Sequence, residues 1–365
     1  MLSPIQKRNW KQVIVFACIW SVSALLYTNI EAGILGDFDY YPSTGNAYDF
    51  WSSLLLTTPF SFVIGLLQGW IEVAFLAKRF QNNSLWVKIL AKTLFYLGFI
   101  LFFLVFLTGV SNSIILERPL FDPLVLQSLV NFIGAFSFWS VIIYISAIIL
   151  FAITFFEMVN YFGMSLLFDL LRGRFHHPNT EVRIFMFLDM KSSTSIAEKI
   201  GHTQYFHLIK NYYADMTEPI LETEGEIYQY VGDEIVVSWL EKKGLFHNNC
   251  VHCFRKISES IEANRQKYLD QFGFVPQFKA GFHMGEVTSG AIGILKKEII
   301  YTGDILNTTA RIQAECNKYE TQLLLSDELY EKLAKEDGFK GVLIGALQLR
   351  GKSEPTNLYS LSFCS

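Results

Sequence analysis

Residues 183–190 read Arg-Ile-Phe-Met-Phe-Leu-Asp-Met, an apolar run with one acidic residue, Asp189, near its end. A short run of Ile, Phe and Leu followed by polar turn residues is typical of a strand buried on both faces of a sheet. Residues 191–194 (Lys-Ser-Ser-Thr) predict the start of a helix, and Ser195 and Glu198 have capping-box spacing. The stretch therefore predicts a central strand that ends in a carboxylate.

Strands and helices interleave after this point. A helical pattern precedes a hairpin whose turn, Val231-Gly-Asp-Glu234, carries Asp233. The expected helices cover residues 203–222, 247–271 and 304–316, and the expected strands cover 226–230, 235–240, 277–283 and 286–292. Alternation of this kind indicates an α+β fold, which we expect to have helices on one face of its sheet.

Asp189 and Asp233 both lie where a strand ends. Carboxylates in adjacent loops can converge on a hard cation such as Mg²⁺, which prefers oxygen ligands. Gly-Asp is also a plain turn signal. The pair alone therefore leaves a metal site and an ordinary turn both open.

Five ordered stretches of residues 180–363 resemble the class III nucleotidyl cyclases. They are Phe187-Leu-Asp189, Tyr230-Val-Gly-Asp233, the glycine-spaced segment 281–293, Gly303-Asp-Ile-Leu-Asn307 continuing to Arg311, and Arg350-Gly-Lys352. The resemblance implies a ferredoxin-like α+β cyclase domain. It also implies that ATP is converted to 3′,5′-cyclic AMP and pyrophosphate, and it does not extend to the N-terminal half.

The resemblance also assigns roles to residues. Asp189, Asp233 and the backbone of Met190 would hold two Mg²⁺ (or Mn²⁺) ions, as in other two-metal sites. Asn307 would orient the ribose, and Arg311 and Arg350 would stabilise negative charge in the transition state. The helix start at Lys191, Ser192, Ser193 and Thr194 would bind phosphate through backbone amides.

In this family the aspartates of one subunit face the Asn/Arg pair of the other. The resemblance therefore implies a head-to-tail homodimer with two equivalent sites.

Several positions depart from the family pattern. The two positions expected to choose the purine are Gln277 and Ile300, which match neither the adenine nor the guanine code. Ile300 cannot hydrogen-bond a base. Lys279 shares a strand face with Gln277 and is an alternative purine contact. Arg350 stands where Lys is usual, and Ser193 stands where an aromatic residue is usual.

The N-terminal half differs in composition. Four apolar runs, over residues 13–30, 50–76, 85–110 and 126–159, are long enough to cross a bilayer. Basic residues precede the first run and surround the second loop, whereas the first loop is acidic. The positive-inside rule therefore predicts a multi-pass protein of the inner cell membrane, with its N-terminus and C-terminal half in the cytoplasm.

Two ionisable residues lie inside the predicted spans, Glu72 in the second and Lys92 in the third. Such residues are functional candidates by default. A structural ion pair between them is the favoured interpretation. Sensing of a ligand or ion, and extension of the side chains to the membrane interface, are the alternatives.

The predicted organisation has three parts: four membrane helices in residues 1–157, a connector helix in 158–180 and the catalytic domain in 181–365. Leucines 166, 167, 170 and 171 share one helical face of the connector. That face would either pair across a dimer or dock on the next domain.

Composition excludes other classes of protein. The chain is 51% hydrophobic and 18% charged, with mean hydropathy +0.30, which is unlike a soluble or disordered protein. A net charge of −4 argues against nucleic-acid partners.

The alternatives to an adenylate cyclase are a guanylate cyclase and a catalytically silent nucleotide-binding receptor. A transporter is disfavoured, since the predicted spans hold only Glu72 and Lys92 as buried charges.

Overall fold

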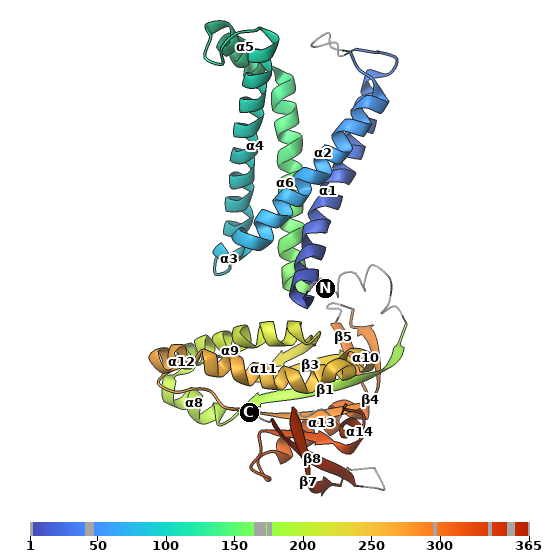
Figure 1. The fold of residues 1–365 in the computed structure, drawn as a ribbon, viewed down its shortest axis with the longest axis vertical. Coiled ribbons are helices and arrows are strands. Elements are labelled where there is room, and N and C mark those ends of the chain that lie inside the picture. The colour runs from blue at the N-terminus through green and yellow to red at the C-terminus, as the bar shows by residue number, and fades with distance from the viewer. Residues whose placement is uncertain are drawn as a thin grey trace. The chain divides into compact units, whose positions relative to one another are not determined.

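The structure is a computed structural model that describes residues 3–40, 47–163, 173, 177–294, 298–334, 338–348 and 355–363. The chain divides into two units, one formed by Lys7–Phe168 and the other by Met1–Gln6 and Asp169–Ser365. Figure 1 shows helices alone in the first unit and a mixed sheet with helices in the second. The expected connector leucines lie outside the described residues, so the predicted boundaries of the connector stay a prediction.

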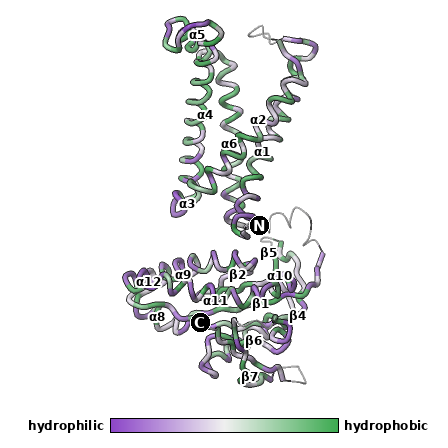
Figure 2. The backbone as a smooth tube through the Cα atoms, viewed as in Figure 1, coloured by the Kyte–Doolittle hydropathy of each residue, from purple (hydrophilic) through white to green (hydrophobic). Residues whose placement is uncertain are grey.

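The first unit contains four helices long and apolar enough to cross a membrane. They are α1 (Pro4–Leu35), α2 (Phe50–Ile71) with a π-helical turn (Glu72–Leu76) and α3 (Ala77–Arg79), α4 (Leu85–Ile115), and α6 (Phe136–Phe162). Figure 2 shows the predominance of hydrophobic residues along these helices. Four apolar helices are compatible with a membrane protein, as the hydropathy pattern predicted.

The fourth predicted run, 126–159, is wrong as a single span. Its first part is a separate short helix, α5 (Pro123–Gly134), and the backbone is extended at Ala135 before α6 begins at Phe136. Gly134 is a poor helix former, which favours the break at that point. Hydropathy alone does not register a turn between two apolar helices.

Close packing joins α1 and α2 through two glycines spaced four residues apart. A Cβ atom on Gly65 would lie 2.6 Å from Cα of Ala17, and one on Gly69 would lie 2.8 Å from Cα of Val13. Small residues at this spacing let two helix backbones approach each other in a membrane. The glycines are therefore part of the packing of this unit.

A buried ionic cluster connects the π-helical turn after α2 with α4 and α6. Lys92 Nζ donates to Glu72 Oε1 and, at 2.6 Å, to Glu157 Oε1. The three residues are at most 2% exposed, and Tyr96 Oη donates to Glu72 Oε2 at 3.3 Å. The predicted Glu72–Lys92 pair is confirmed. The expectation that these are the only buried charges is wrong, because Glu157 is a third.

The second unit is built on an eight-stranded sheet in the order β2-β3-β1-β4-β6-β8-β7, with β5 paired to β4. The strands are β1 (Asn179–Met190), β2 (Glu226–Val231), β3 (Glu234–Leu240), β4 (Phe278–Ile292), β5 (Glu298–Thr302), β6 (Leu323–Ser326), β7 (Phe339–Leu347) and β8 (Thr356–Phe363). The helices are α8 (Ser193–Ile200), α9 (His202–Glu222), α10 (Glu241–Leu245), α11 (Asn249–Ala263), α12 (Arg265–Phe272), α13 (Asp304–Glu315) and α14 (Asp327–Tyr330).

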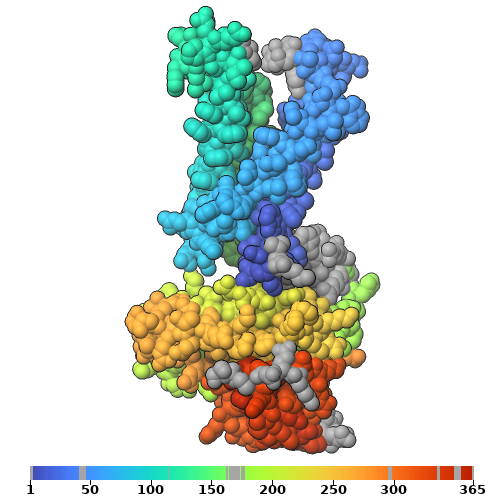
Figure 3. Space-filling view, in the orientation of Figure 1, coloured from blue at the N-terminus to red at the C-terminus, as the bar shows by residue number. Residues whose placement is uncertain are grey.

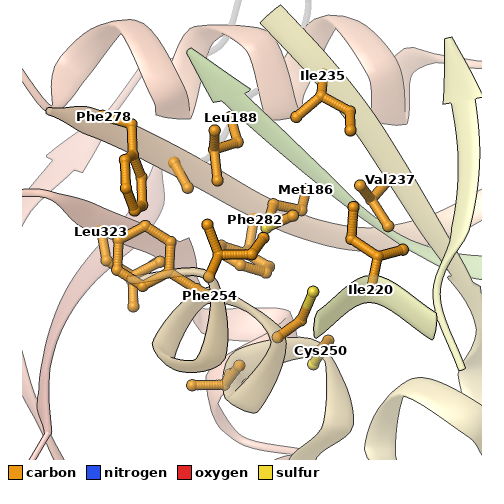
Figure 4. Packing of buried hydrophobic residues seen from close by; sticks show 14 of the residues in the cluster. Met186, Leu188, Ile220, Ile235, Val237, Cys250, Phe254, Phe278, Phe282 and Leu323 are labelled. Carbon is orange, nitrogen blue, oxygen red and sulfur yellow. The ribbon is translucent and has the colours of Figure 1, made fainter. Parts of the chain in front are cut away.

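Helices cover both faces of this sheet, which corrects the expectation of one covered face. Alternate residues of β1 enter different cores. Met186 and Leu188 pack with α9 and α11 on one face (Figure 4), whereas Phe185 and Phe187 pack with Ile305 of α13 on the other. In the space-filling view, α11 and α12 form much of the surface of this unit (Figure 3).

Three local expectations also need correction. Residues 278–292 form one strand rather than the two expected over 277–283 and 286–292, because β1 pairs with β4 from Phe278 to Ser289 without a break. The helix expected over 247–271 is divided at Asn264, whose side chain donates to the carbonyl of Ser260 at 2.9 Å. The helix after β1 begins at Ser193, so Ser195 does not cap it.

Candidate active site

Asp189 is held near the end of the central strand β1, opposite Lys279 of β4. Lys279 Nζ lies 3.6 Å from Asp189 Oδ2, and Gln313 Nε2 of α13 donates to the same oxygen at 3.2 Å. Burial, hydrogen bonding with Asp233 and repulsion from Asp233 raise the pKa of Asp189 to about 6. The strand therefore places this carboxylate against a second carboxylate in a partly dry site.

Asp233 occupies the two-residue turn between β2 and β3, after Gly232 with φ +66°. Its Oδ2 atom is buried and has no hydrogen-bond partner among the described residues. Burial, followed by the charges of Asp189 and Asp233, raises the pKa of the adjacent Glu234 to about 7. The raised pKa values of Asp189 and Glu234 and the unpaired Asp233 oxygen indicate a cluster of carboxylates with too little nearby positive charge.

The donor set fits a hard divalent cation that also binds substrate oxygens. Within the described ranges, no group of three or more His, Cys, Asp or Glu side chains could hold a metal ion. Asp189 and Asp233 are the pair of carboxylates whose side chains interact at this site. Mg²⁺ is commonly bound by one or two carboxylates together with water and substrate phosphates.

A pocket of about 490 Å³ opens beside Asp189. It gathers the predicted metal and phosphate residues from the end of β1 and the start of α8, together with Lys279. Its lining residues are Asp189, Met190, Lys191, Ser192, Ser193, Thr194, Lys279, Cys316, Asn317 and Glu320. The expected phosphate segment thus lies next to Asp189, as the motif order predicted.

Asn307 and Arg311 lie elsewhere. Both are exposed on α13, and neither bonds to another described residue. Gln313, which contacts Asp189, lies two residues after Arg311 and therefore roughly 200° around the helix. Within one chain, Arg311 is turned away from the aspartates.

The two expected purine positions are also separated. Gln277 is exposed before β4, and its carbonyl oxygen accepts a hydrogen bond from the Lys191 amide at 2.8 Å. Ile300 of β5 pairs with Gly290, near the far end of β4 from Lys279. Gln277 and Ile300 therefore do not form a shared pocket within one chain. Lys279 lies in the aspartate site, and Arg350 lies outside the described residues.

Sequence reasoning missed three groups that surround the aspartates. Gln313 had a signal, because it is a polar residue on the buried stripe of α13 that also holds Ile305 and Thr309. Burial raises the pKa of Tyr205 of α9, the charge of Asp233 raises it further, and a hydrogen bond with Ser193 lowers it. Glu234 had no distinguishing signal, since an acidic residue after a turn is ordinary.

The cyclase catalytic-domain profile, described as "Adenylate and Guanylate cyclase catalytic domain", matches residues 176–362 of the chain. The chain belongs to this family, the class III nucleotidyl cyclases. The matched range contains Asp189, Asp233, Asn307 and Arg311. It also contains the whole pocket, so the clustered polar residues belong to the cyclase domain.

Three curated relatives match this domain. Adenylate cyclase 2 of Rhizobium meliloti (strain 1021) is 32% identical over 200 residues, which are 55% of each chain. The adenylate cyclase of Anabaena cylindrica is 23% identical over 193 residues, 50% of this chain and 37% of that protein. The receptor-type guanylate cyclase gcy-6 of Caenorhabditis elegans is 28% identical over 189 residues, 49% of this chain and 17% of that protein.

The chain thus spans about half the length of the first of these relatives and less of the other two. Among solved structures, the cyclase CyaB from P. aeruginosa matches 51% of this chain and 96% of that chain, at 20% identity and a TM-score of 0.45.

Proposed function

We propose that the chain is a membrane-anchored adenylate cyclase that converts ATP to 3′,5′-cyclic AMP and pyrophosphate at a homodimer interface. The observation that carries the proposal is the juxtaposition of Asp189 and Asp233, with an unpaired buried Asp233 oxygen, beside the pocket of a class III cyclase domain. The named relatives that are adenylate cyclases support this reaction.

Asp189, Asp233 and the Met190 backbone would hold two Mg²⁺ or Mn²⁺ ions. When bound, the ions supply charge neutralisation for the triphosphate and a lower pKa for the ribose 3′-hydroxyl. The protein's part is to keep the two carboxylates close together despite their repulsion. Gln313 and Lys279 hold the Asp189 carboxylate in a fixed direction.

The start of α8 would receive the phosphates. Residues 191–194 line the pocket next to Asp189, and the first backbone amides of a helix are free to donate to an anion. Lys279 lines the same pocket and adds a positive charge. The 3′-hydroxyl oxygen would then bond to the α-phosphorus while the bond from that phosphorus to the pyrophosphate oxygen breaks. The hydroxyl proton would pass to water, and pyrophosphate would leave with the bonding electron pair.

A second chain would complete the site. Asn307 and Arg311 are exposed and turned away from the aspartates of their own chain. In a two-fold head-to-tail dimer each pair faces the other chain's pocket. There Asn307 would orient the ribose, and Arg311 with Arg350 would stabilise the charge that develops on the phosphate.

Guanylate cyclase activity is the second candidate. The sequence identity of this chain to the guanylate cyclase gcy-6 is 28%, whereas its identity to the Anabaena cylindrica adenylate cyclase is 23%. The chain's Ile300 cannot hydrogen-bond either purine. The choice of ATP therefore rests on the relatives rather than on a base-reading residue.

The four apolar helices would anchor the enzyme in the inner cell membrane. By the positive-inside rule, the basic residues beside the first and second helices favour an orientation with the N-terminus and the catalytic domain in the cytoplasm. ATP is available on that side.

The test measures cyclic AMP and cyclic GMP made by the full-length protein in membranes, with Mn²⁺ and either ATP or GTP. We expect faster turnover of ATP and at least a hundredfold loss in Asp233→Ala. Faster turnover of GTP than of ATP would show that the enzyme is a guanylate cyclase instead. Full activity in Asp233→Ala would overturn the proposed metal site.

A further inference from the structure

The hydroxyl of Tyr213 contacts the turn that carries Asp233. Tyr213 belongs to α9, and its Oη lies 2.9 Å from the carbonyl oxygen of Gly232 and 3.1 Å from that of Glu234. These are the carbonyls on either side of Asp233. One phenolic proton is thus shared between two acceptors, as in a three-centre hydrogen bond.

The turn closes a hairpin at the edge of the sheet. Among the described strands β2 pairs with β3 alone, and the last three residues of β2 are exposed. A register shift between Ile227 and Gln229 further loosens the pairing of β2. Asp233 Oδ2 has no partner among the described residues, although the carboxylate interacts with Asp189 and Tyr205. The backbone of the turn therefore contributes to the direction of this side chain.

Tyr213 is itself well anchored. Its ring lies 4.5 Å from that of Tyr230 on β2, centroid to centroid. The same helix is fixed in the core by Leu208, Tyr212 and Met216, all fully buried. A well-packed helix therefore holds the carbonyl groups of the residues before and after Asp233.

We propose that Tyr213 is a positioning residue for the metal ligand Asp233. This inference rests on the proposed function. The Tyr213 hydroxyl donates to backbone carbonyls of the turn, and it acts by fixing the two carbonyls between which the Asp233 side chain emerges. Loss of the hydroxyl leaves the carboxylate in place but free to turn, so metal affinity falls while the fold persists.

The chain offers a matched control in the neighbouring residue. Tyr212 is fully buried, and its hydroxyl has no hydrogen-bond partner among the described residues. Tyr213→Phe and Tyr212→Phe remove the same atom from adjacent positions. Only the first removes contacts to the Asp233 turn.

The experiment titrates Mn²⁺ into the purified full-length chain with 3′-deoxy-ATP, which lacks the attacking hydroxyl, and follows free Mn²⁺ by electron paramagnetic resonance. We expect Tyr213→Phe to weaken Mn²⁺ binding about 5- to 10-fold, the range for one lost neutral hydrogen bond. With ATP, the Mn²⁺ concentration for half-maximal rate should rise by the same factor, and the rate at saturating Mn²⁺ should change less than twofold. Tyr212→Phe should match the wild type in each measurement.

A double-mutant cycle with Asp233→Asn separates positioning from a general effect on folding. In that background Tyr213→Phe should weaken Mn²⁺ binding less than twofold further, since the two sites act as a unit. Equal Mn²⁺ binding by Tyr213→Phe and wild type, or an undiminished effect in Asp233→Asn, would overturn the inference. A wild-type chain that neither binds Mn²⁺ nor cyclises ATP would instead overturn the proposed function.

Discussion

At the scale of single residues, the raised pKa values of two carboxylates make the cyclase domain sensitive to pH. The pKa of Asp189 is raised from 3.8 to about 6, and that of Glu234 from 4.5 to about 7. A folded state that holds these protons more tightly than the unfolded chain is stabilised at low pH. That stabilisation is lost as the pH rises through 6 and 7.

We therefore expect the thermal midpoint of the full chain in EDTA to fall between pH 5 and pH 8, and added Mn²⁺ to restore it at pH 8. Differential scanning fluorimetry at four pH values measures both effects. Asp189→Asn is the control, because it cannot lose a proton and should flatten part of the pH dependence. A midpoint that rises with pH in EDTA would contradict this account.

A single glycine fixes the distance between β4 and α13. A Cβ on Gly281 would lie 2.3 Å from the backbone nitrogen of Gln313, whereas one on Gly285 of the same strand would lie 3.5 Å from its nearest neighbour, in Ile305. Gly281→Ala should displace α13 and with it the Gln313–Asp189 contact. We expect a destabilisation of about 1–3 kcal/mol and a loss of activity.

Gly285→Ala provides the matched comparison, since its added methyl meets ordinary van der Waals space. Denaturant unfolding and cyclase assays on both variants measure the difference. Equal effects of the two substitutions would show that the approach of α13 to Gly281 does not control the site.

The sequence predicted the site residues that lie inside a recognisable local motif. Asp189 follows an apolar strand and Asp233 follows a glycine turn, and the structure brings the two together. It could not predict that Gln313 and Lys279 hold Asp189, because their contacts depend on the rotation of α13 and on the register between β1 and β4.

At the scale of elements, the cluster of Lys92 with Glu72 and Glu157 connects three helices. One ammonium group lies against two carboxylates. Among the described residues, removal of Lys92 leaves buried Glu72 without a cation and leaves Glu157 with Lys88, 3.9 Å away. Removal of Glu72 still leaves the close Lys92–Glu157 pair. Breaking a buried pair by removing one partner costs about 3–5 kcal/mol. Lys92→Met should therefore be far more damaging than Glu72→Gln.

Yield and thermal midpoint of the full chain in detergent measure this prediction. Lys78→Met, at an exposed lysine of α3, controls for the loss of a positive charge. The triple variant Lys92→Met, Glu72→Gln, Glu157→Gln should recover part of the loss. Equal stability of Lys92→Met and Glu72→Gln would show that the two carboxylates do not share the ammonium group.

The helices and strands were predicted best where a single physical effect, such as burial of apolar residues, determines the structure. Apolar periodicity located the membrane helices, since burial in lipid requires about 20 apolar residues. The same signal failed at Ala135, where an apolar helix ends beside another. It also failed at β4, because a strand that pairs on both sides continues through Gly285 without any local signal.

At the scale of the whole molecule, the average composition combines an apolar part suited to lipid with a charged part suited to water. Residues 1–165 hold equal numbers of acidic and basic residues, so the net charge of −4 belongs to the rest of the chain. The sequence predicted this division because lipid and water select different residues. Contacts between copies depend on the shape of the surface, which the sequence does not reveal. Among the described residues, Asn307 and Arg311 point to such contacts, because they face away from their own chain's aspartates.

The outward orientation of Asn307 and Arg311 leads to a prediction about dimers that contain two different variant chains. If each site takes its aspartates from one chain and its Arg311 from the other, Asp233→Ala and Arg311→Ala should each be inactive alone. Random mixing gives half of the dimers one variant chain of each kind, and such a dimer retains one intact site of two. Co-expression should therefore restore about a quarter of wild-type activity.

Co-expression of Asp233→Ala with Asp189→Ala is the control, because both chains then lack a metal ligand and no intact site can form. Activity is measured as cyclic AMP from membranes that contain equal amounts of the two chains, verified with two different tags. Arg311→Ala that is active on its own would refute a role for this residue in the site. Co-purified Asp233→Ala and Arg311→Ala chains without recovered activity would show that each chain builds its site from its own residues. In that case α13 would have to turn by nearly half a revolution to bring Arg311 to Asp189, and the Gln313–Asp189 bond would have to break.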